Sequence, residues 1–191
     1  MKHRETNYKT DRELVAAVLV GDKQAFAVFV RQTENLVAKI IFQMTGGSGD
    51  RKDLAQEIYI RAYQNLAGFQ FRSKLSTWIA QIAYYDCLHY LKKKKLTYLE
   101  NIPEESISAD TDLPAEMRLF QSDLSIILTE AVAQLPPLYQ TLITLFHEEE
   151  MSYSEIAGIT GLPEGTIKNY LFRARRVLRD YLLKRYDKEE L

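Results

Sequence analysis

The chain has 191 residues, and its 25 Lys and Arg residues nearly balance its 26 Asp and Glu residues, leaving a formal net charge of −1. This balance excludes a polybasic tail protein and a strongly acidic solvating protein, and the length suits one or two domains that each bury a core. Hydrophobic residues make up 46% of the chain, with only eight glycines and five prolines, so long helices are favoured over many short strands. We therefore predict an all-α fold.

The cysteine and histidine content gives no sign of a disulfide or a metal centre. Cys87 stands alone, and the three histidines His3, His89 and His147 lie outside zinc-ligand spacings, so we expect neither a metal site nor a cofactor. The polar start MKHRETNYKTDRE lacks the apolar stretch of a signal peptide, and no apolar run approaches the roughly 20 residues that span a bilayer. These features predict a cytoplasmic protein without membrane insertion.

Helix signals divide the first half of the chain into four predicted helices. Their approximate limits are 11–20, 23–44, 51–66 and 75–95. Thr10 and Asp22 are suited to cap the first two helices, and Asp50, after the turn TGGSGD, is suited to cap the third. The segment 68–74 interrupts the helical pattern, so we expect an irregular loop before the fourth helix.

The composition changes in the middle of the chain. Residues 97–123 carry seven acidic side chains against one arginine and include two prolines. We therefore predict an acidic linker at 96–126, which would join a domain at 1–95 to a second helical domain at 127–191.

The second domain shows several helix boundaries. The Pro-Pro pair at 136–137 can stop one helix and start another. Ser152 and Glu155 have the spacing of a capping box, which predicts a short helix after them. Gly161 marks a tight turn, and Pro163 suits the first position of a final long helix.

The segment MSYSEIAGITGLPEGTIKNYLFRARRVLRDYL has the layout of a helix-turn-helix, which presents its second helix to the major groove of DNA. Residues 163–185 carry seven cations against two acids, and Arg, Lys and Asn can bond base edges while further arginines neutralise phosphates. The side chains expected to face the duplex are Glu164, Thr166, Lys168, Asn169, Phe172, Arg173 and Arg176. The alternative interpretation is a helical hairpin with a solvated basic face.

Two patterns mark the first domain. The string DLAQE places Asp53, Gln56 and Glu57 on one helix face, which Arg61 continues; this face could dock a basic partner helix, although an ordinary solvated face has the same pattern. Eight of the 21 aromatic residues lie within 59–90, among basic residues. Aromatic rings with cations suit unpaired nucleic acid, and an irregular loop could hold a flipped base, whereas rings at helical spacing are also typical of a core.

In this order and at this separation, these features resemble the bacterial RNA polymerase sigma factors of the extracytoplasmic-function (ECF) type. The segment beginning DLAQEIYIRAYQNLAGF resembles the second region of that family, and the segment beginning LPPLYQTLITLFHEEEMSYSEIAG resembles its fourth. The resemblance implies a region 2 helical bundle and a region 4 helix-turn-helix joined by the acidic linker. It also implies a protein without enzymatic activity that binds core RNA polymerase and directs promoter recognition, DNA melting and transcription initiation.

By matching position, the resemblance also implies roles for individual residues. Asp53, Gln56 and Glu57, with Arg61, would bind the clamp helices of the largest polymerase subunit, while the second domain would contact the flap and read the minus-thirty-five element. The residues that would hold the melted minus-ten element are Phe69, Phe71, Arg72, Lys74, Thr77, Trp78, Gln81, Tyr84, Tyr85, Lys92 and Lys93. The resemblance also implies an anti-sigma factor as a partner.

Two departures and two alternatives accompany the resemblance. Tyr85 stands where the family often has Asn and His89 where it often has Asp, which bears on base preference. A helix-turn-helix regulator that binds duplex DNA without polymerase would need neither DLAQE nor the aromatic cluster. An enzyme is disfavoured, because Ser152, Ser154 and His147 lack an acid-oriented triad and no Gly-rich phosphate loop accompanies them.

Overall fold

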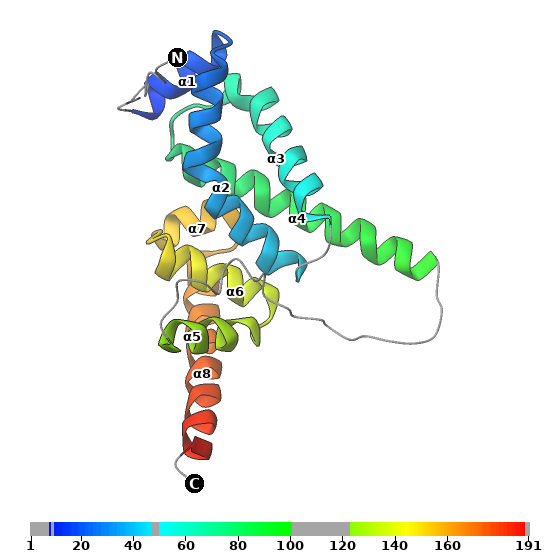
Figure 1. Ribbon diagram of the computed structural model, residues 1–191, viewed down its shortest axis with the longest axis vertical. Helices are drawn as coiled ribbons and strands as arrows, with labels where there is room; N and C mark the ends of the chain where they lie inside the picture. Colours follow the sequence, from blue (N-terminus) through cyan, green and yellow to red (C-terminus); the bar gives the residue numbers. More distant parts are fainter. Residues whose placement is uncertain (1–7, 9, 47–49, 101–122, 190–191) are drawn as a thin grey trace.

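Every regular element in the described part of the chain is a helix, as the predicted all-α class requires (Figure 1). The computed structural model describes residues 8, 10–46, 50–100 and 123–189. The first domain comprises α1 (Asp11–Leu19), α2 (Lys23–Thr45), α3 (Arg51–Asn65), the 3-10 turn η1 (Leu66–Gly68) and α4 (Leu75–Glu100). The second comprises α5 (Asp123–Ala133), α6 (Pro137–Ile143), the π-helical turn η3 (Thr144–Glu148), α7 (Tyr153–Thr160) and α8 (Glu164–Glu189).

Predicted caps account for the start of three helices. Thr10 Oγ1 accepts the backbone N–H of Glu13 at 3.2 Å in the first turn of α1. Asp22 Oδ1 accepts the backbone N–H of Gln24 at 2.8 Å, which satisfies a free donor in the first turn of α2. At α7, Ser152 Oγ accepts the N–H of Glu155 at 3.2 Å, and Glu155 Oε2 accepts the N–H of Ser152 at 2.8 Å. The predicted capping box is therefore confirmed in both directions.

Three boundary predictions are wrong in detail. Asp50 precedes α3 but forms no side-chain cap; its Oδ2 instead accepts the Tyr90 hydroxyl at 2.6 Å, a partner 40 residues away that no local pattern reveals. Helix α4 continues to Glu100, so the first residues of the expected linker are helical, while 101–122 lie outside the described residues. Helix α8 begins one residue after Pro163.

Each domain buries an apolar core of its own residues. In the first domain the fully buried side chains include Phe29, Ile40, Ile58 and Ile79, and in the second they include Leu142, Leu145, Ile156, Ile159 and Ile167. Burial of one such side chain contributes about 1.5–3 kcal/mol relative to exposure, so these residues hold the helices in register.

The two domains pack against each other. Helix α2 contacts α6, and α4 contacts α7, so the second domain covers one side of the first (Figure 1). Buried apolar residues from both domains form one continuous cluster. The exposure of the faces proposed for nucleic acid is therefore that of the packed state.

Candidate nucleic-acid and polymerase interfaces

The turn between α7 and α8 has the geometry that a helix-turn-helix requires. Gly161 has φ +72°, a left-handed conformation that other residues rarely adopt, and its N–H donates to the Ala157 carbonyl at 2.9 Å. Ile156, Ile167 and Leu171 are fully buried and lock α7 against α8. The long helix α8 is thereby fixed by its apolar side.

The opposite side of α8 is open to solvent. Six of the seven residues predicted to face DNA are exposed, and Thr166 is half-buried. Phe172 is 66% exposed, an unusual state for a large ring that burial would otherwise stabilise. The ammonium of Lys168 lies 5.0 Å from the centre of the Tyr153 ring of α7, so a cation–π contact orients it.

Further along α8, the arginines have partners in the helix itself. Arg175 Nε donates to the Leu171 carbonyl at 3.2 Å. Arg176 and Arg179 approach the two oxygens of Asp180 at 4.0 and 2.9 Å. The exposed pairs with Asp180 are weak, so Arg176 and Arg179 can exchange Asp180 for phosphate at little cost.

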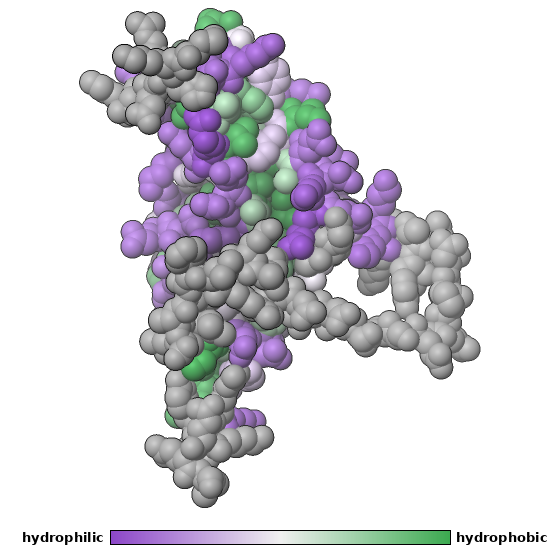
Figure 2. Space-filling model, viewed as in Figure 1, coloured by the Kyte–Doolittle hydropathy of each residue, from purple (hydrophilic) through white to green (hydrophobic). Residues whose placement is uncertain are grey.

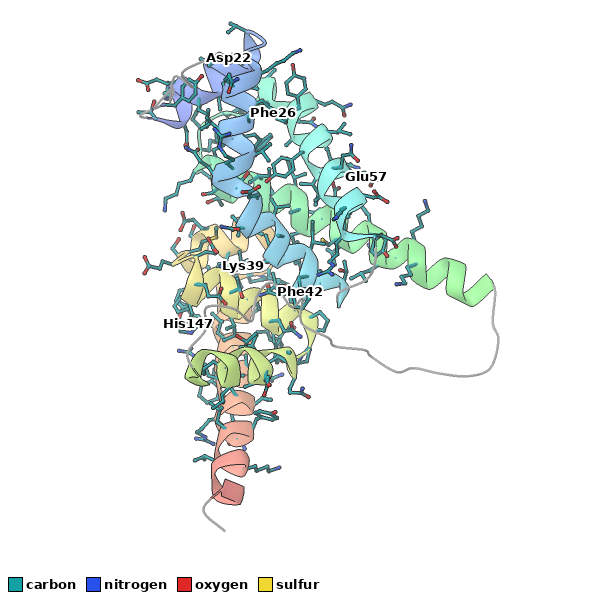
Figure 3. All side chains as sticks on the ribbon, in the orientation of Figure 1. Asp22, Phe26, Lys39, Phe42, Glu57 and His147 are labelled. Atoms are coloured by element: carbon teal, nitrogen blue, oxygen red, sulfur yellow. The ribbon has the colours of Figure 1, made fainter. Side chains whose placement is uncertain are left out.

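The acidic face of α3 that the sequence predicts is exposed to solvent. Asp53, Gln56 and Glu57 are exposed, and Glu57 projects from the outer side of α3 in Figure 3. Arg61 is different, because its Nε lies 3.1 Å from Oδ2 of the buried Asp86 on α4. Burial raises the pKa of Asp86, while the charges of Arg61 and His89 oppose that change.

An apolar groove beside this face was not expected from the sequence. It has a volume of about 560 Å³ and lies between α2 and α3, lined by Phe26, Val30, Tyr59, Ile60 and Tyr63 among others. Figure 2 shows the corresponding apolar strip between hydrophilic flanks. Ile60 and Tyr63 are about half-exposed. Their i, i+3 spacing within DLAQEIYIRAY is the feature of the sequence that could have indicated an exposed apolar surface.

The loop that precedes α4 is organised by its aromatic rings. The Phe69 ring centre lies 4.7 Å from that of Phe71 and 5.3 Å from that of Trp78, and the Arg12 guanidinium lies 4.9 Å from the centre of the Phe71 ring. Phe71 has φ +55°, an outlier for a bulky residue that carries a backbone cost of about 1–3 kcal/mol. Such strain persists only where the surroundings fix it, and it is concentrated at functional sites.

A long-range cap supports the same loop. Asp11 Oδ2 of α1 accepts the backbone N–H of Leu75 at 2.8 Å, at the first residue of α4. The sequence offered no sign of this contact, because the two residues are 64 positions apart.

The residues proposed for the minus-ten element fall into three groups: buried, half-buried and exposed. Phe69, Thr77 and Tyr84 are buried, and burial raises the pKa of Tyr84; two of these rings thus confirm that part of the aromatic cluster belongs to the core. Phe71 and Trp78 are half-buried. The exposed members are Arg72, Lys74, Gln81, Tyr85, Lys92 and Lys93.

Two of the exposed members contact the second domain. Gln81 Nε2 donates to the Gly158 carbonyl at 2.8 Å, and Lys74 Nζ lies 3.4 Å from Glu155 Oε1. The face of α4 that carries them is thus partly covered by α7.

Taken together, a helical bundle with an acidic face and a helix-turn-helix with a basic face define a sigma factor of the sigma-70 class. The family model for Sigma-70 region 2 matches residues 29–97, and the model for Sigma-70 region 4 matches residues 125–178. Within that class, the chain belongs to the ECF RNA polymerase sigma factors. As a member of that family, it binds core RNA polymerase and directs it to promoters.

The comparisons behind this assignment cover nearly the whole chain. The ECF RNA polymerase sigma factor SigW of Bacillus subtilis is 33% identical over 180 residues, covering 90% of this chain and 96% of that protein. The ECF RNA polymerase sigma-E factor of Haemophilus influenzae is 32% identical over 182 residues, covering 88% and 93%.

Solved structures share the fold. The sigma factor RpoE in complex with the anti-sigma factor NepR, from Bartonella quintana, has a TM-score of 0.67 at 22% identity and covers 82% of this chain and 96% of that one. CnrH in complex with the cytosolic domain of CnrY has a TM-score of 0.62 at 20% identity and covers 90% and 96%. Among the helices described here, none is both long and apolar enough to cross a membrane.

Proposed function

We propose that this sigma factor divides its task among three surfaces. The acidic face of α3 (Asp53, Gln56 and Glu57) binds the polymerase clamp helices, the loop 68–74 and α4 hold the melted minus-ten strand, and α8 reads the minus-thirty-five duplex. The observation that carries this division is that the acidic face of α3 and the basic face of α8 are both exposed, on helices of different domains.

The chemistry of α3 supports the first assignment. Carboxylates form strong charge-assisted bonds with Arg and Lys of a partner helix. The apolar groove beside them, with Gln56 in its wall, can take the apolar side chains of the same partner. Arg61 is better assigned to positioning α3 against α4, because its guanidinium pairs with Asp86.

The two surfaces proposed for DNA bind different forms of it. Side chains of α8 bond base edges and phosphates of intact DNA, which fixes register. Rings of the loop and α4 stack on unpaired bases, and about 1–3 kcal/mol per stacked base offsets the few kcal/mol that unstacking costs at each step. Capture of one or two bases is therefore sufficient to favour promoter opening, and no covalent chemistry is needed.

Two further assignments follow from the family. We propose an anti-sigma factor as a regulatory partner, because the sigma factor RpoE, which has a similar fold, was solved in complex with the anti-sigma factor NepR. We also propose that the chain acts in the cytoplasm, where polymerase and promoter DNA are found, and that it has no enzymatic activity of its own.

Run-off transcription on a promoter library with purified core polymerase tests the proposal. We expect promoter-specific transcripts only when the chain is present. The variant Asp53→Lys with Glu57→Lys should lose polymerase in co-purification, whereas Glu34→Lys, the same change at an exposed carboxylate of α2, should retain it. Recovery of polymerase with the double variant would contradict the α3 assignment, and duplex binding without any transcription would favour a polymerase-independent regulator.

A further inference from the structure

We infer that α1 is part of the minus-ten site: its first turn holds the loop 68–74 in the shape that captures unpaired bases. Asp11 and Arg12 are the positioning residues. The inference rests on the proposed function of the loop and of α4. Two contacts between residues far apart in the sequence carry it, and we refer to them together as the brace: Asp11 with Leu75, and Arg12 with Phe71.

The brace belongs to a helix that the core holds in place. Leu14, Val15 and Val18 of α1 are each 2% exposed, and the helix packs against α2. Burial of these side chains fixes the first turn of α1 relative to the helical bundle. The same helix contacts the η1 turn, from which the loop leaves. The first turn of α1 is therefore a fixed support beside the loop.

Asp11 completes the start of α4. The first N–H groups of a helix have no partner within the helix, and Asp11 Oδ2 accepts the N–H of Leu75 at 2.8 Å. Ser73, a nearby residue with capping chemistry, instead donates its hydroxyl to the Lys74 carbonyl at 3.4 Å. A carboxylate at this position also interacts favourably with the dipole of α4. The end of the loop is thus fixed by α1 rather than by its own sequence.

Arg12 contacts the residue whose backbone is strained. Its guanidinium lies 4.9 Å from the centre of the Phe71 ring, and Phe71 has φ +55°, a conformation that persists only where the surroundings stabilise it. The Phe71 ring also lies 4.7 Å from the ring of the buried Phe69. A cation in the first turn of a helix opposes the helix dipole, so the stability of α1 does not account for Arg12. Its contact with the loop does.

The brace can decide the shape of the loop because the opposing free energies are similar in size. A strained backbone at one bulky residue, one helix cap and one cation–π contact are energetically comparable. Loss of either contact therefore allows Phe71 to leave the left-handed conformation, while the core of the first domain stays folded. A loop with several shapes binds more weakly, because only the fraction in the capturing shape is competent.

Fluorescence of the free, full-length chain measures the brace directly. Trp78 is the only tryptophan in the sequence, it is half-buried, and its ring centre lies 5.3 Å from that of Phe69. We expect Asp11→Ala and Arg12→Ala to shift its emission to longer wavelength, because water reaches the ring, with helix content by circular dichroism unchanged. Asp11→Asn keeps an oxygen acceptor and should have the wild-type emission. Unchanged emission in either alanine variant would overturn the inference.

Holoenzyme binding to DNA that is already open tests the consequence for capture. A promoter found in the transcription experiment is prepared in three forms: a fork fragment with unpaired minus-ten bases, the same fragment fully paired, and a shorter duplex with the minus-thirty-five element alone. Asp11→Ala and Arg12→Ala should each weaken binding to the fork fragment by about five- to tenfold, the usual effect of one lost cap or contact. Both should bind the shorter duplex as wild type does.

Matched variants control for charge and for folding. Arg31→Ala removes an exposed arginine from α2, and Asp11→Asn removes a charge without removing the cap acceptor; both should bind the fork fragment as wild type does. Equal losses by the alanine variants on the fork fragment and on the shorter duplex would indicate a general defect and overturn the inference.

Salt dependence separates positioning by Arg12 from direct contact with DNA. If Arg12 bound a phosphate of the unpaired strand, Arg12→Ala would reduce the slope of log affinity against log salt by about 0.7. As a positioning residue, Arg12 should lower the affinity at every salt concentration and leave the slope unchanged. A slope reduced by that amount would overturn the positioning role.

The wild-type holoenzyme distinguishes failure of this inference from failure of the proposed function. A wild type that prefers the fork fragment to the fully paired one, with alanine variants that keep the same preference, would overturn the role of α1 alone. A wild type without that preference would contradict the capture of bases by the loop and α4, and the inference would fail with it.

Discussion

The two helices assigned to DNA, α4 and α8, each have 26 residues but are built in different ways. Helix α4 packs against α2, α3 and α7, so part of its aromatic set belongs to the core and part is covered. Helix α8 presents its polar side to solvent along much of its length. The difference suits the two proposed targets: an intact duplex offers its edges to any exposed helix, whereas an unpaired base needs rings that are already held in place.

Removing one ring from each helix should give the largest contrast. Tyr84 is 5% exposed, so Tyr84→Ala should lower the free energy of unfolding by about 3–5 kcal/mol through a cavity. Phe172 is 66% exposed, so Phe172→Ala should change it by less than about 0.5 kcal/mol while weakening duplex binding. Denaturant unfolding measures both values. Equal losses of stability would contradict the division between core and surface.

A cation on α8 should affect DNA binding alone. Arg173 is exposed at the centre of the proposed reading face, so Arg173→Ala should weaken duplex promoter binding by about 1–3 kcal/mol and leave polymerase binding unchanged. Arg175→Ala is the control, because that side chain bonds the backbone of its own helix. Affinity measured over a series of salt concentrations will show whether the lost contact is to phosphate, since the slope then falls by about one.

Local sequence patterns predicted the helix-turn-helix of α7 and α8 better than the surroundings of α4. The capping box and the tight turn at Gly161 involve residues close in sequence, and both were predicted. The surroundings of α4 depend on distant partners. The Asp11 cap, the Tyr90 bond to Asp50 and the Arg61–Asp86 pair cross tens of residues, and no periodicity encodes such contacts.

The packing of the domains could not be predicted for a similar reason. The sequence alone does not distinguish three interdomain charges from ordinary surface charges, because their pairing requires contact between the two domains. These residues are Lys39, Glu148 and Glu149. The aromatic cluster was ambiguous between core and binding site, and its rings are divided between buried and exposed positions. The residue roles at the DNA and polymerase surfaces stay predictions until the variants above are measured.

A methyl group at Gly161 should separate the fold of the second domain from its contact with α4. Gly161→Ala should destabilise the second domain by about 1 kcal/mol, because the residue has φ +72°. The methyl group would also meet the Tyr85 hydroxyl at 2.8 Å, but that hydroxyl is the far end of an exposed side chain and can move aside at little cost. Adding Tyr85→Phe removes that oxygen and should leave the loss of stability unchanged. Recovery of stability in the double variant, measured by denaturant unfolding, would show that the contact with Tyr85, and not the left-handed backbone, causes the loss.

Acidification should have the smallest effect on stability, and the sign of the effect should differ between the two domains. The Ser152 N–H and hydroxyl, and then the charge of Lys74, hold the pKa of Glu155 below its usual 4.5, against a small desolvation cost. A depressed pKa means that the cap's stabilisation is complete above about pH 4.5 and is lost as the pH falls through the folded value. Asp86 has the opposite sign: burial raises its pKa, so its contribution is lost as the pH rises through its folded value.

Amide hydrogen exchange followed between pH 6 and pH 3 can resolve these two signs, once rates are corrected for the intrinsic pH dependence. Protection of the first turn of α7 should fall on acidification, by less than about 1 kcal/mol, which is the usual worth of one cap. Glu155→Gln keeps an acceptor for the Ser152 N–H but does not titrate, so α7 should lose its pH dependence while α4 keeps its own. If the pH dependence of α7 persists in Glu155→Gln, a group other than this carboxylate controls the start of the helix-turn-helix.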